Sequence, residues 1–181
     1  AEGRLWTANN RVTAGADLEV VGDGAYGLGA RARQIRDDLR ALEQPREHDM
    51  LAVQLDDRAV FLAEWRGFVL DVLERRPPQA GSSRETCRRI VRGEWTGRAE
   101  PASVAHRLVR GFMSTCVELV YDPLTARCAD ADGEFRTFRL PFRHAVTWEV
   151  LHAAPPHLLP PRFGDWDDLV LQAVDRVMED A

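Results

Sequence analysis

Two adjacent amides near the start of the chain are the side chains best suited to chemistry. An apolar run ends there in two asparagines and a cation, as Gly3-Arg4-Leu5-Trp6-Thr7-Ala8-Asn9-Asn10-Arg11. Asparagine is a poor strand former because its side chain competes for backbone hydrogen bonds, so the pair suits the end of a strand. A fixed side-chain NH2 there can donate to an oxygen that gains charge in a transition state, as in an oxyanion hole. The alternative interpretation is an Asx-type turn that closes the strand.

A second cationic cluster, Arg31 and Arg33, opens an expected helix in Leu28-Gly29-Ala30-Arg31-Ala32-Arg33-Gln34-Ile35. The Thr-Ala-Asn-Asn-Arg string, this helix start and Met50-Leu51-Ala52-Val53-Gln54-Leu55-Asp56 together resemble the penicillin acylase (penicillin amidase) family of N-terminal-nucleophile amidohydrolases. Two later segments resemble that family in the same order. They are Gly93-Glu94-Trp95-Thr96-Gly97 with Ser103-Val104-Ala105, and Leu158-Leu159-Pro160-Pro161 with Asp165-Trp166-Asp167-Asp168-Leu169.

The resemblance implies an internal fragment of the large (beta) subunit of an αββα N-terminal-nucleophile hydrolase. In such enzymes the first residue of that subunit, usually Ser, is the nucleophile, and its own amine is the base. This chain begins Ala1-Glu2-Gly3, so we expect it to lack the nucleophile and to be inactive alone. By resemblance, Asn9 is the oxyanion-hole amide and Arg31 supports the site electrostatically. Asn10 and Arg33 are expected to be a turn partner and a helix-surface charge.

The resemblance also implies the reaction and the partners. The parent enzyme is expected to cleave linear amides, such as β-lactam side chains or acyl-homoserine lactones, through an acyl-enzyme. Its partners are then the small subunit and the nucleophile-bearing part of the large subunit, in a periplasmic or secreted enzyme. No cofactor is assigned to this segment. Many members of the family carry calcium, with an acidic ligand from the loop that holds Asp17, Glu19 and Asp23, and the residue count selects none of the three.

Composition excludes several classes of protein. The chain has 181 residues, 45% of them hydrophobic, which allows a sizeable core and argues against general disorder. A formal net charge of −5 argues against a nucleic-acid footprint. No apolar run is long enough to span a membrane, and all 24 basic residues are arginine, a bias best attributed to genomic base composition.

The cysteines and histidines support no established motif. Cys87, Cys116 and Cys128 form no C-x-x-C pair, which excludes a zinc site of the usual spacing. A Cys116–Cys128 disulfide and three buried thiols are both open, with buried thiols favoured. Ser103 and His106 would share a helix face, but no nucleophile elbow surrounds them, so a stand-alone Ser-His hydrolase is disfavoured. Adjacent Asp56 and Asp57 point to different faces and are expected to be surface charges.

The expected fold is mainly α, with a short strand at residues 5–8, a Gly-rich loop at 13–29 and a small hairpin near 128–140. Asp132-Gly133 would be the turn of that hairpin, because Phe135 and Phe138 fit a calcium loop poorly. Ser83 is the expected N-cap of a helix over 83–92. Asp122-Pro123 is expected to end a helix over 101–121. The expected domains are 1–76, resembling the oxyanion-hole region, and 77–181, divided at Pro77-Pro78. The periodicity and breakers predict helices over 30–42, 47–73, 83–92, 101–121, 144–152 and 165–178.

A second function class stays open at this stage. A non-enzymatic helical interaction module would show the same amphipathic faces, because an excised domain and a docking module bury apolar surface in the same way. The two interpretations differ in what they require earlier in the gene. The acylase interpretation requires a Gly-Ser, Gly-Cys or Gly-Thr processing site earlier in the same reading frame, and the module requires none.

Overall fold

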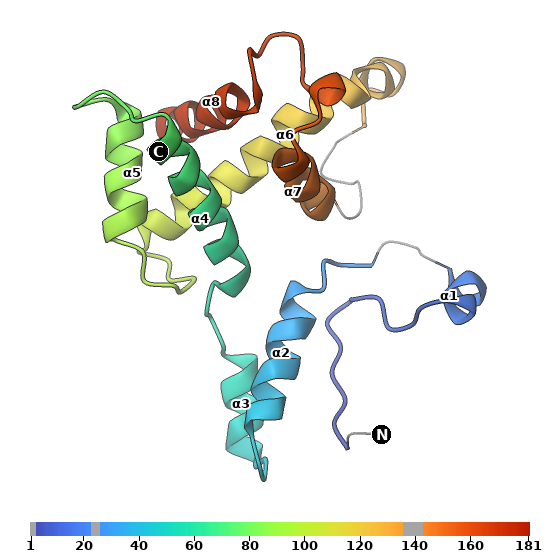
Figure 1. Cartoon of the computed structure of the whole chain (residues 1–181). Coiled ribbons are helices and arrows are strands. Elements are labelled where there is room, and N and C mark those ends of the chain that lie inside the picture. The colour runs from blue at the N-terminus through green and yellow to red at the C-terminus, as the bar shows by residue number, and fades with distance from the viewer. Residues whose placement is uncertain (1–2, 23–25, 136–142) are drawn as a thin grey trace. The chain divides into compact units, whose positions relative to one another are not determined.

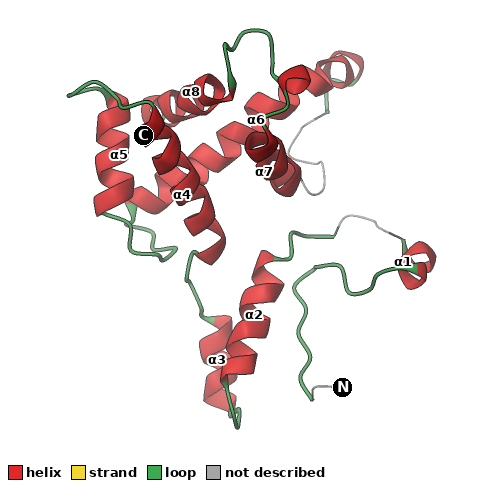
Figure 2. Ribbon diagram, in the orientation of Figure 1, coloured by secondary structure: helices red, strands yellow, loops and turns green. Residues whose placement is uncertain are grey.

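The computed structural model describes residues 3–22, 26–135 and 143–181, and these are helix and loop (Figures 1 and 2). The prediction of a mainly α chain is confirmed. Within the described ranges the backbone forms no strand, only an isolated antiparallel bridge between Arg58 and Arg98. The strand expected at residues 5–8 is therefore wrong, and the sheet layers of the αββα architecture are not seen in this part of the chain.

The N-terminal segment runs along a helix instead of joining a sheet. The helix is α2 (Ala30–Ala41), close to the predicted 30–42. Arg4 Nη2 donates to the backbone oxygen of Leu42, and the Arg40 guanidinium lies 5.4 Å from the centre of the Trp6 ring. Since a strand needs a neighbouring strand to take its backbone hydrogen bonds, an extended segment beside a helix remains unpaired.

The chain forms two compact units, Ala1–Asp57 and Arg58–Ala181. The first holds α1 (Ala16–Val21), α2 and α3 (Glu47–Gln54), with α3 packed on α2. The second holds α4 (Val60–Arg75) and all later elements. The division expected between residues 76 and 77 falls inside the second unit, directly after α4.

The single helix predicted over 47–73 is wrong, because α3 ends at Gln54 and α4 begins at Val60. Two tertiary interactions hold the interrupted stretch. Asp56 accepts a hydrogen bond from the Gln34 amide, and the Ala59 N–H donates to the Gly97 backbone oxygen at 2.7 Å. The predicted apolar stripe is divided accordingly: the α4 part is buried, whereas Leu51 and Leu55 of the α3 side are exposed.

The second unit is a helical bundle centred on α6 (Val104–Ala131). α4, α5 (Ser83–Gly93), α7 (Arg143–Ala153) and α8 (Trp166–Glu179) each pack against α6, and a short 3-10 turn (Pro156–Leu158) precedes α8 (Figure 1). α6 and α8 approach closely, since a Cβ on Gly111 would lie 3.3 Å from a Val177 methyl. The most completely buried large side chains include Trp65, Val69, Val72, Leu73, Val91, Val109, Leu119, Leu169, Val170 and Val174.

The predicted bounds of α6 are wrong at both ends. Pro101 lies before the helix, which starts at Val104 with Ser103 as N-cap, and Pro123 lies inside it. Proline removes one backbone hydrogen bond, but its φ is helical, so a helix rich in good formers can continue past it. The first arm of the expected 128–140 hairpin is therefore helical through Ala131. The Asp132-Gly133 turn is present, with the Phe135 N–H donating to the Asp132 backbone oxygen, and residues 136–140 lie outside the described ranges.

Two other local predictions need correction. The N-cap of α5 is Ser82, whose hydroxyl accepts from the Glu85 N–H at 3.2 Å, and not Ser83. The Cys116–Cys128 disulfide is wrong, because all three cysteines are free. Cys116 and Cys128 stand in one continuous helix, where twelve residues span about 18 Å. Cys87 and Cys116 are buried, as favoured, whereas Cys128 is exposed.

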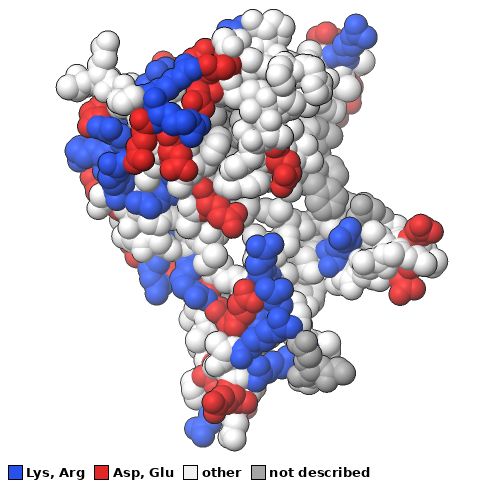
Figure 3. Space-filling model, viewed as in Figure 1, with Lys and Arg blue, Asp and Glu red and all other residues white. Residues whose placement is uncertain are grey.

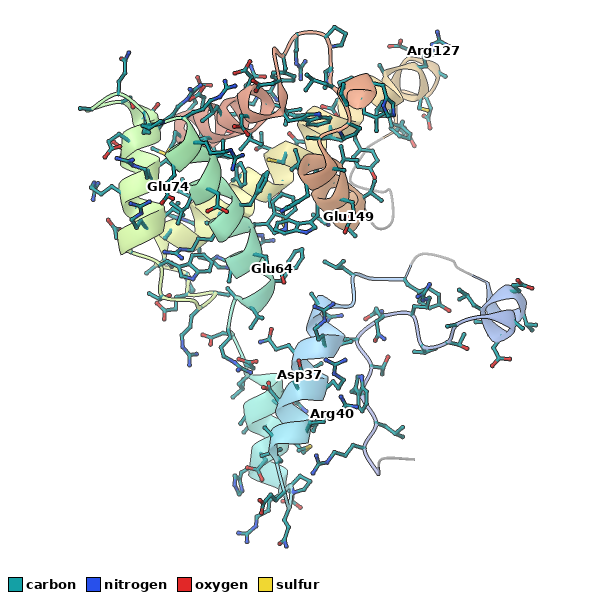
Figure 4. The ribbon with its side chains drawn as sticks, in the orientation of Figure 1. Asp37, Arg40, Glu64, Glu74, Arg127 and Glu149 are labelled. Carbon is teal, nitrogen blue, oxygen red and sulfur yellow. The ribbon has the colours of Figure 1, made fainter. Side chains whose placement is uncertain are left out.

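Arginine–aspartate pairs join α4 and α5 to α8. Arg75 forms two hydrogen bonds with Asp167, the shorter of 2.7 Å, and Arg76 contacts both Asp165 and Asp168. Cationic and acidic side chains intermix over these helices in Figure 3. A further pair joins Arg92 to Glu74, which is labelled on α4 in Figure 4. These pairs are partly exposed, so they add little to the net stability. Their main effect is to fix the positions of the helices relative to one another.

Candidate functional site

The structure brings Asn9 and Arg31 into direct contact. Arg31 is the second residue of α2, and its Nη2 donates to Asn9 Oδ1 at 3.1 Å and to the Ala8 backbone oxygen at 3.2 Å. Because the guanidinium holds the amide oxygen, the orientation of the Asn9 amide is defined, and its NH2 points away from the arginine. The predicted pair of site residues is thus one hydrogen-bonded unit.

The backbone at Asn9 is held by the glycine-rich loop. Asn9 has φ 59°, a left-handed conformation that asparagine tolerates better than most residues. Its backbone oxygen accepts from the Gly27 N–H at 2.6 Å. Asn10 closes the turn, since its Oδ1 accepts from the Ala8 N–H at 3.0 Å and its NH2 donates to the Arg11 oxygen. Asn10 therefore stabilises the turn, and Asn9 presents an oriented amide.

The electrostatic environment of the Asn9 amide is positive. Among the described residues, no carboxylate pairs with Arg31, and no acceptor takes a hydrogen bond from the Asn9 NH2. Both side chains are exposed. Arg31 also stands in the first turn of α2, where backbone N–H groups add partial positive charge. An NH2 donor beside an uncompensated guanidinium is suited to an oxygen that carries negative charge.

Sequence reasoning missed Gly27 and the role of the Ala8 carbonyl. A Cβ on Gly27 would lie 3.3 Å from the Asn9 backbone oxygen, so only glycine admits this approach without displacement. Gly27 was visible as one of five glycines in the loop, but nothing local marked it as the one that meets Asn9. The Ala8 carbonyl is invisible to any analysis of side-chain types.

The later segments that carry the resemblance lie at helix junctions of the second unit. The Trp95 ring stacks on His106 with centroids 6.3 Å apart, and the Arg66 guanidinium lies 5.9 Å from its centre. Arg66 also donates to the backbone oxygens of Val91 and Arg92, which closes the C-terminal end of α5. Asp165 caps α8 by accepting from the Asp168 N–H. These segments therefore position helices.

Ser103 and His106 are joined through the backbone and not as a catalytic pair. The Ser103 hydroxyl accepts from the His106 backbone N–H at 3.2 Å as the cap of α6, while the imidazole stacks on Trp95. Burial, with the nearby Arg110 charge, lowers the pKa of His106. The Ser103 hydroxyl and the His106 ring thus each have a structural partner in the second unit.

The acidic residues considered for calcium are not part of a metal-binding cluster among the residues that the structure describes. Asp17 and Glu19 stand in the first turn of α1, and Asp23 lies outside the described residues. Within the described ranges, no three His, Cys, Asp or Glu side chains converge as a metal site would require.

No helix in the described ranges has the length and apolarity needed to cross a bilayer. Asp56 and Asp57 lie in the connector between α3 and α4.

Comparison with known proteins gives one result at the level of the family. The search of curated proteins and the search of solved structures each returned no match. The family model described as penicillin amidase matches residues 1–181, the whole of the sequence. Because this match covers the full length of the sequence, the chain belongs to the penicillin amidase family.

Proposed function

We propose that this chain forms the oxyanion-stabilising part of an amide hydrolase that works through an acyl-enzyme. The Asn9 NH2 donates to the oxygen that becomes negative when a nucleophile attacks the amide carbonyl. The nucleophile, an N-terminal Ser, Cys or Thr, comes from a part of the enzyme outside these 181 residues, and the isolated chain is inactive. The single observation that supports the proposal is the hydrogen bond from Arg31 to Asn9 Oδ1.

That hydrogen bond gives each residue a separate role. Asn9 is the catalytic donor, because its NH2 reaches the developing oxyanion. Arg31 is a positioning residue, because it holds the amide oxygen and thereby selects which end of the amide faces the substrate. Its charge also stabilises the oxyanion at longer range. A donor fixed before the reaction need not reorganise when charge develops, which is why such groups accelerate acyl transfer.

The finer assignments follow from the family resemblance. The substrates are linear amides such as acylated β-lactams or acyl-homoserine lactones, and the enzyme is periplasmic or secreted. No cofactor is assigned to this segment, and a calcium site, such as many family members carry, would belong to the full-length enzyme. The physical partners of the chain are the small subunit and the nucleophile-bearing part of the large subunit. The intact mass and N-terminal residue of the mature enzyme test the processing. A single uncleaved polypeptide would contradict the proposed nucleophile.

The test of the site is Asn9→Ala in the full-length enzyme, assayed with an acyl anilide. Loss of one oxyanion donor lowers kcat by about 10²–10³-fold with little change in KM. Asn10→Ala is the matched control, because Asn10 is adjacent and its amide is engaged in the turn. A kcat for Asn9→Ala no lower than that for Asn10→Ala would refute the role of Asn9.

Arg31 is tested by a double-mutant cycle with Asn9. If Arg31 acts through Asn9, Arg31→Ala lowers kcat strongly in the wild-type background and much less in Asn9→Ala, so the two effects are not additive. Additive losses would mean that Arg31 acts independently of the amide. The Arg31→Lys variant keeps the charge but not the planar donor, and it separates positioning from electrostatics.

A further inference from the structure

A concave pocket lies in the second unit between the start of α5, the segment before α8, and one face of α8. Its volume is about 410 Å³, and its lining is Arg84, Arg162, Phe163, Asp168, Leu171, Gln172 and Asp175. A volume in this range suits a small organic molecule. Four of the lining side chains are charged, so the balance among them decides which ligands the pocket favours.

Both carboxylates of the pocket already have an arginine partner. Asp175 forms a two-point ion pair with Arg84, with N–O distances of 2.7 and 2.5 Å. Asp168 accepts from Arg76 at 2.5 Å and from the Gly164 N–H at 3.1 Å. Arg84 is paired with Asp175, and Arg76 is shared between Asp168 and Asp165, so these charged side chains are already engaged with one another.

Arg162 takes no part in these ion pairs. In the described parts of the chain no carboxylate pairs with it, and its guanidinium lies 4.9 Å from the centre of the Phe163 ring. A cation–π contact orients a guanidinium without neutralising it. Arg162 therefore offers paired N–H donors to an incoming carboxylate, and Phe163 and Leu171 supply apolar wall beside it.

Gln172 supplies the complementary acceptor. Its Oε1 is buried and has no hydrogen-bond partner among the described residues. A buried carbonyl without a partner is unfavourable, and it loses no hydrogen bond if the amide turns toward the pocket that Gln172 lines. A ligand that brings an O–H or N–H to this side of the pocket satisfies the oxygen.

We propose that this pocket binds a small organic carboxylate that carries a hydroxyl or N–H next to an apolar group. The carboxylate pairs with Arg162, the donor group hydrogen-bonds to Gln172, and the apolar group packs on Phe163 and Leu171. The inference goes beyond the proposed hydrolysis, because it uses none of the residues around Asn9. No bond is made or broken in this binding step.

The test uses mandelate, which has a carboxylate, an adjacent hydroxyl and a phenyl ring. The 181-residue chain is titrated at constant ionic strength and followed by two-dimensional NMR of its amides. We expect a Kd on the order of 1–10 mM, with shifts gathered on Arg162, Phe163, Leu171 and Gln172. Mandelamide, which replaces the carboxylate by a neutral amide, should bind at least about fivefold more weakly.

Two variants and a control decide the roles. Arg162→Ala should weaken mandelate about fivefold to tenfold, whereas Arg107→Ala, which removes an exposed arginine of α6 outside the pocket, should leave the Kd unchanged. Gln172→Leu should weaken mandelate several-fold while leaving Tm unchanged or higher, because it removes an oxygen that has no partner. A purely structural glutamine would not produce this combination.

Three outcomes would overturn the proposal. The first is the absence of localised shifts at about 50 mM mandelate, well above the expected Kd. The second is equal weakening by Arg162→Ala and Arg107→Ala, which would mean diffuse attraction to an arginine-rich surface. The third is equal affinity for mandelate and mandelamide, which would show that the ligand charge does not matter.

Discussion

Leu73→Ala is the substitution whose effect the structure predicts most directly. Leu73 is fully buried in the core of the second unit. The change removes three carbon atoms, each worth about 0.8 kcal/mol in transfer free energy. A cavity that relaxes only partly adds to this, so we expect the free energy of unfolding to fall by about 3–4 kcal/mol.

The assay is urea unfolding followed by circular dichroism. With an m-value of about 1–3 kcal/mol/M, the midpoint should fall by on the order of 1–4 M. Leu124→Ala is the matched control, because Leu124 lies in the same unit on α6 and is 57% exposed. Its effect should stay within about 0.5 kcal/mol.

Leu51→Ala tests the interruption between α3 and α4. A continuous amphipathic helix would bury Leu51 and Leu73 alike, whereas Leu51 is 55% exposed. Equal losses of stability for Leu51→Ala and Leu73→Ala would refute the division of the stripe. A loss below about 1 kcal/mol for Leu73→Ala would refute the placement of the core.

Two further predictions concern titration and thiols. The hydrogen bond from the Asp168 N–H, with Arg76 beside it, lowers the pKa of Asp165. The stability that the Asp165 carboxylate contributes is therefore complete above its unfolded pKa of about 3.9. That stability is lost as the pH falls through the lower pKa of the folded state. Asp165→Asn should therefore flatten the Tm profile between about pH 5 and pH 2, and an unchanged profile would contradict this role. Burial raises the pKa of Cys87 to about 11 and raises the pKa of Cys116 well above its usual value, whereas Cys128 is exposed. A thiol reagent should titrate one cysteine in the native chain and all three after unfolding, and reaction of more than one native thiol would count against the buried positions.

Local rules in the sequence account for most of the helices. α2, α5 and α8 lie within one or two residues of their predicted ranges, because apolar periodicity and nearby capping residues are local properties. The buried face of α6 was predictable for the same reason: Leu108, Phe112, Cys116 and Leu119 recur at helical spacing. The sequence likewise pointed to Asn9 and Arg31, through the segment that resembles the family.

The remainder depended on contacts between residues far apart in the chain. The break before α4 is held by Gln34 and Gly97, and no pattern within residues 47–73 specifies those partners. The extended segment at residues 5–8 lies on α2 because the described part of the chain offers it no strand, and pairing is a property of the neighbour.

The candidate site shows the same division. The types of Asn9 and Arg31 are sequence properties, whereas the orientation of the amide required the guanidinium to arrive from α2 and the backbone to approach Gly27. The sequence by itself therefore determined the helical class, the family and the chemical groups. Only the tertiary structure decided where helices stop, which apolar residues are buried and which donor stays free, because those outcomes depend on non-local packing and hydrogen bonds that local periodicity does not encode.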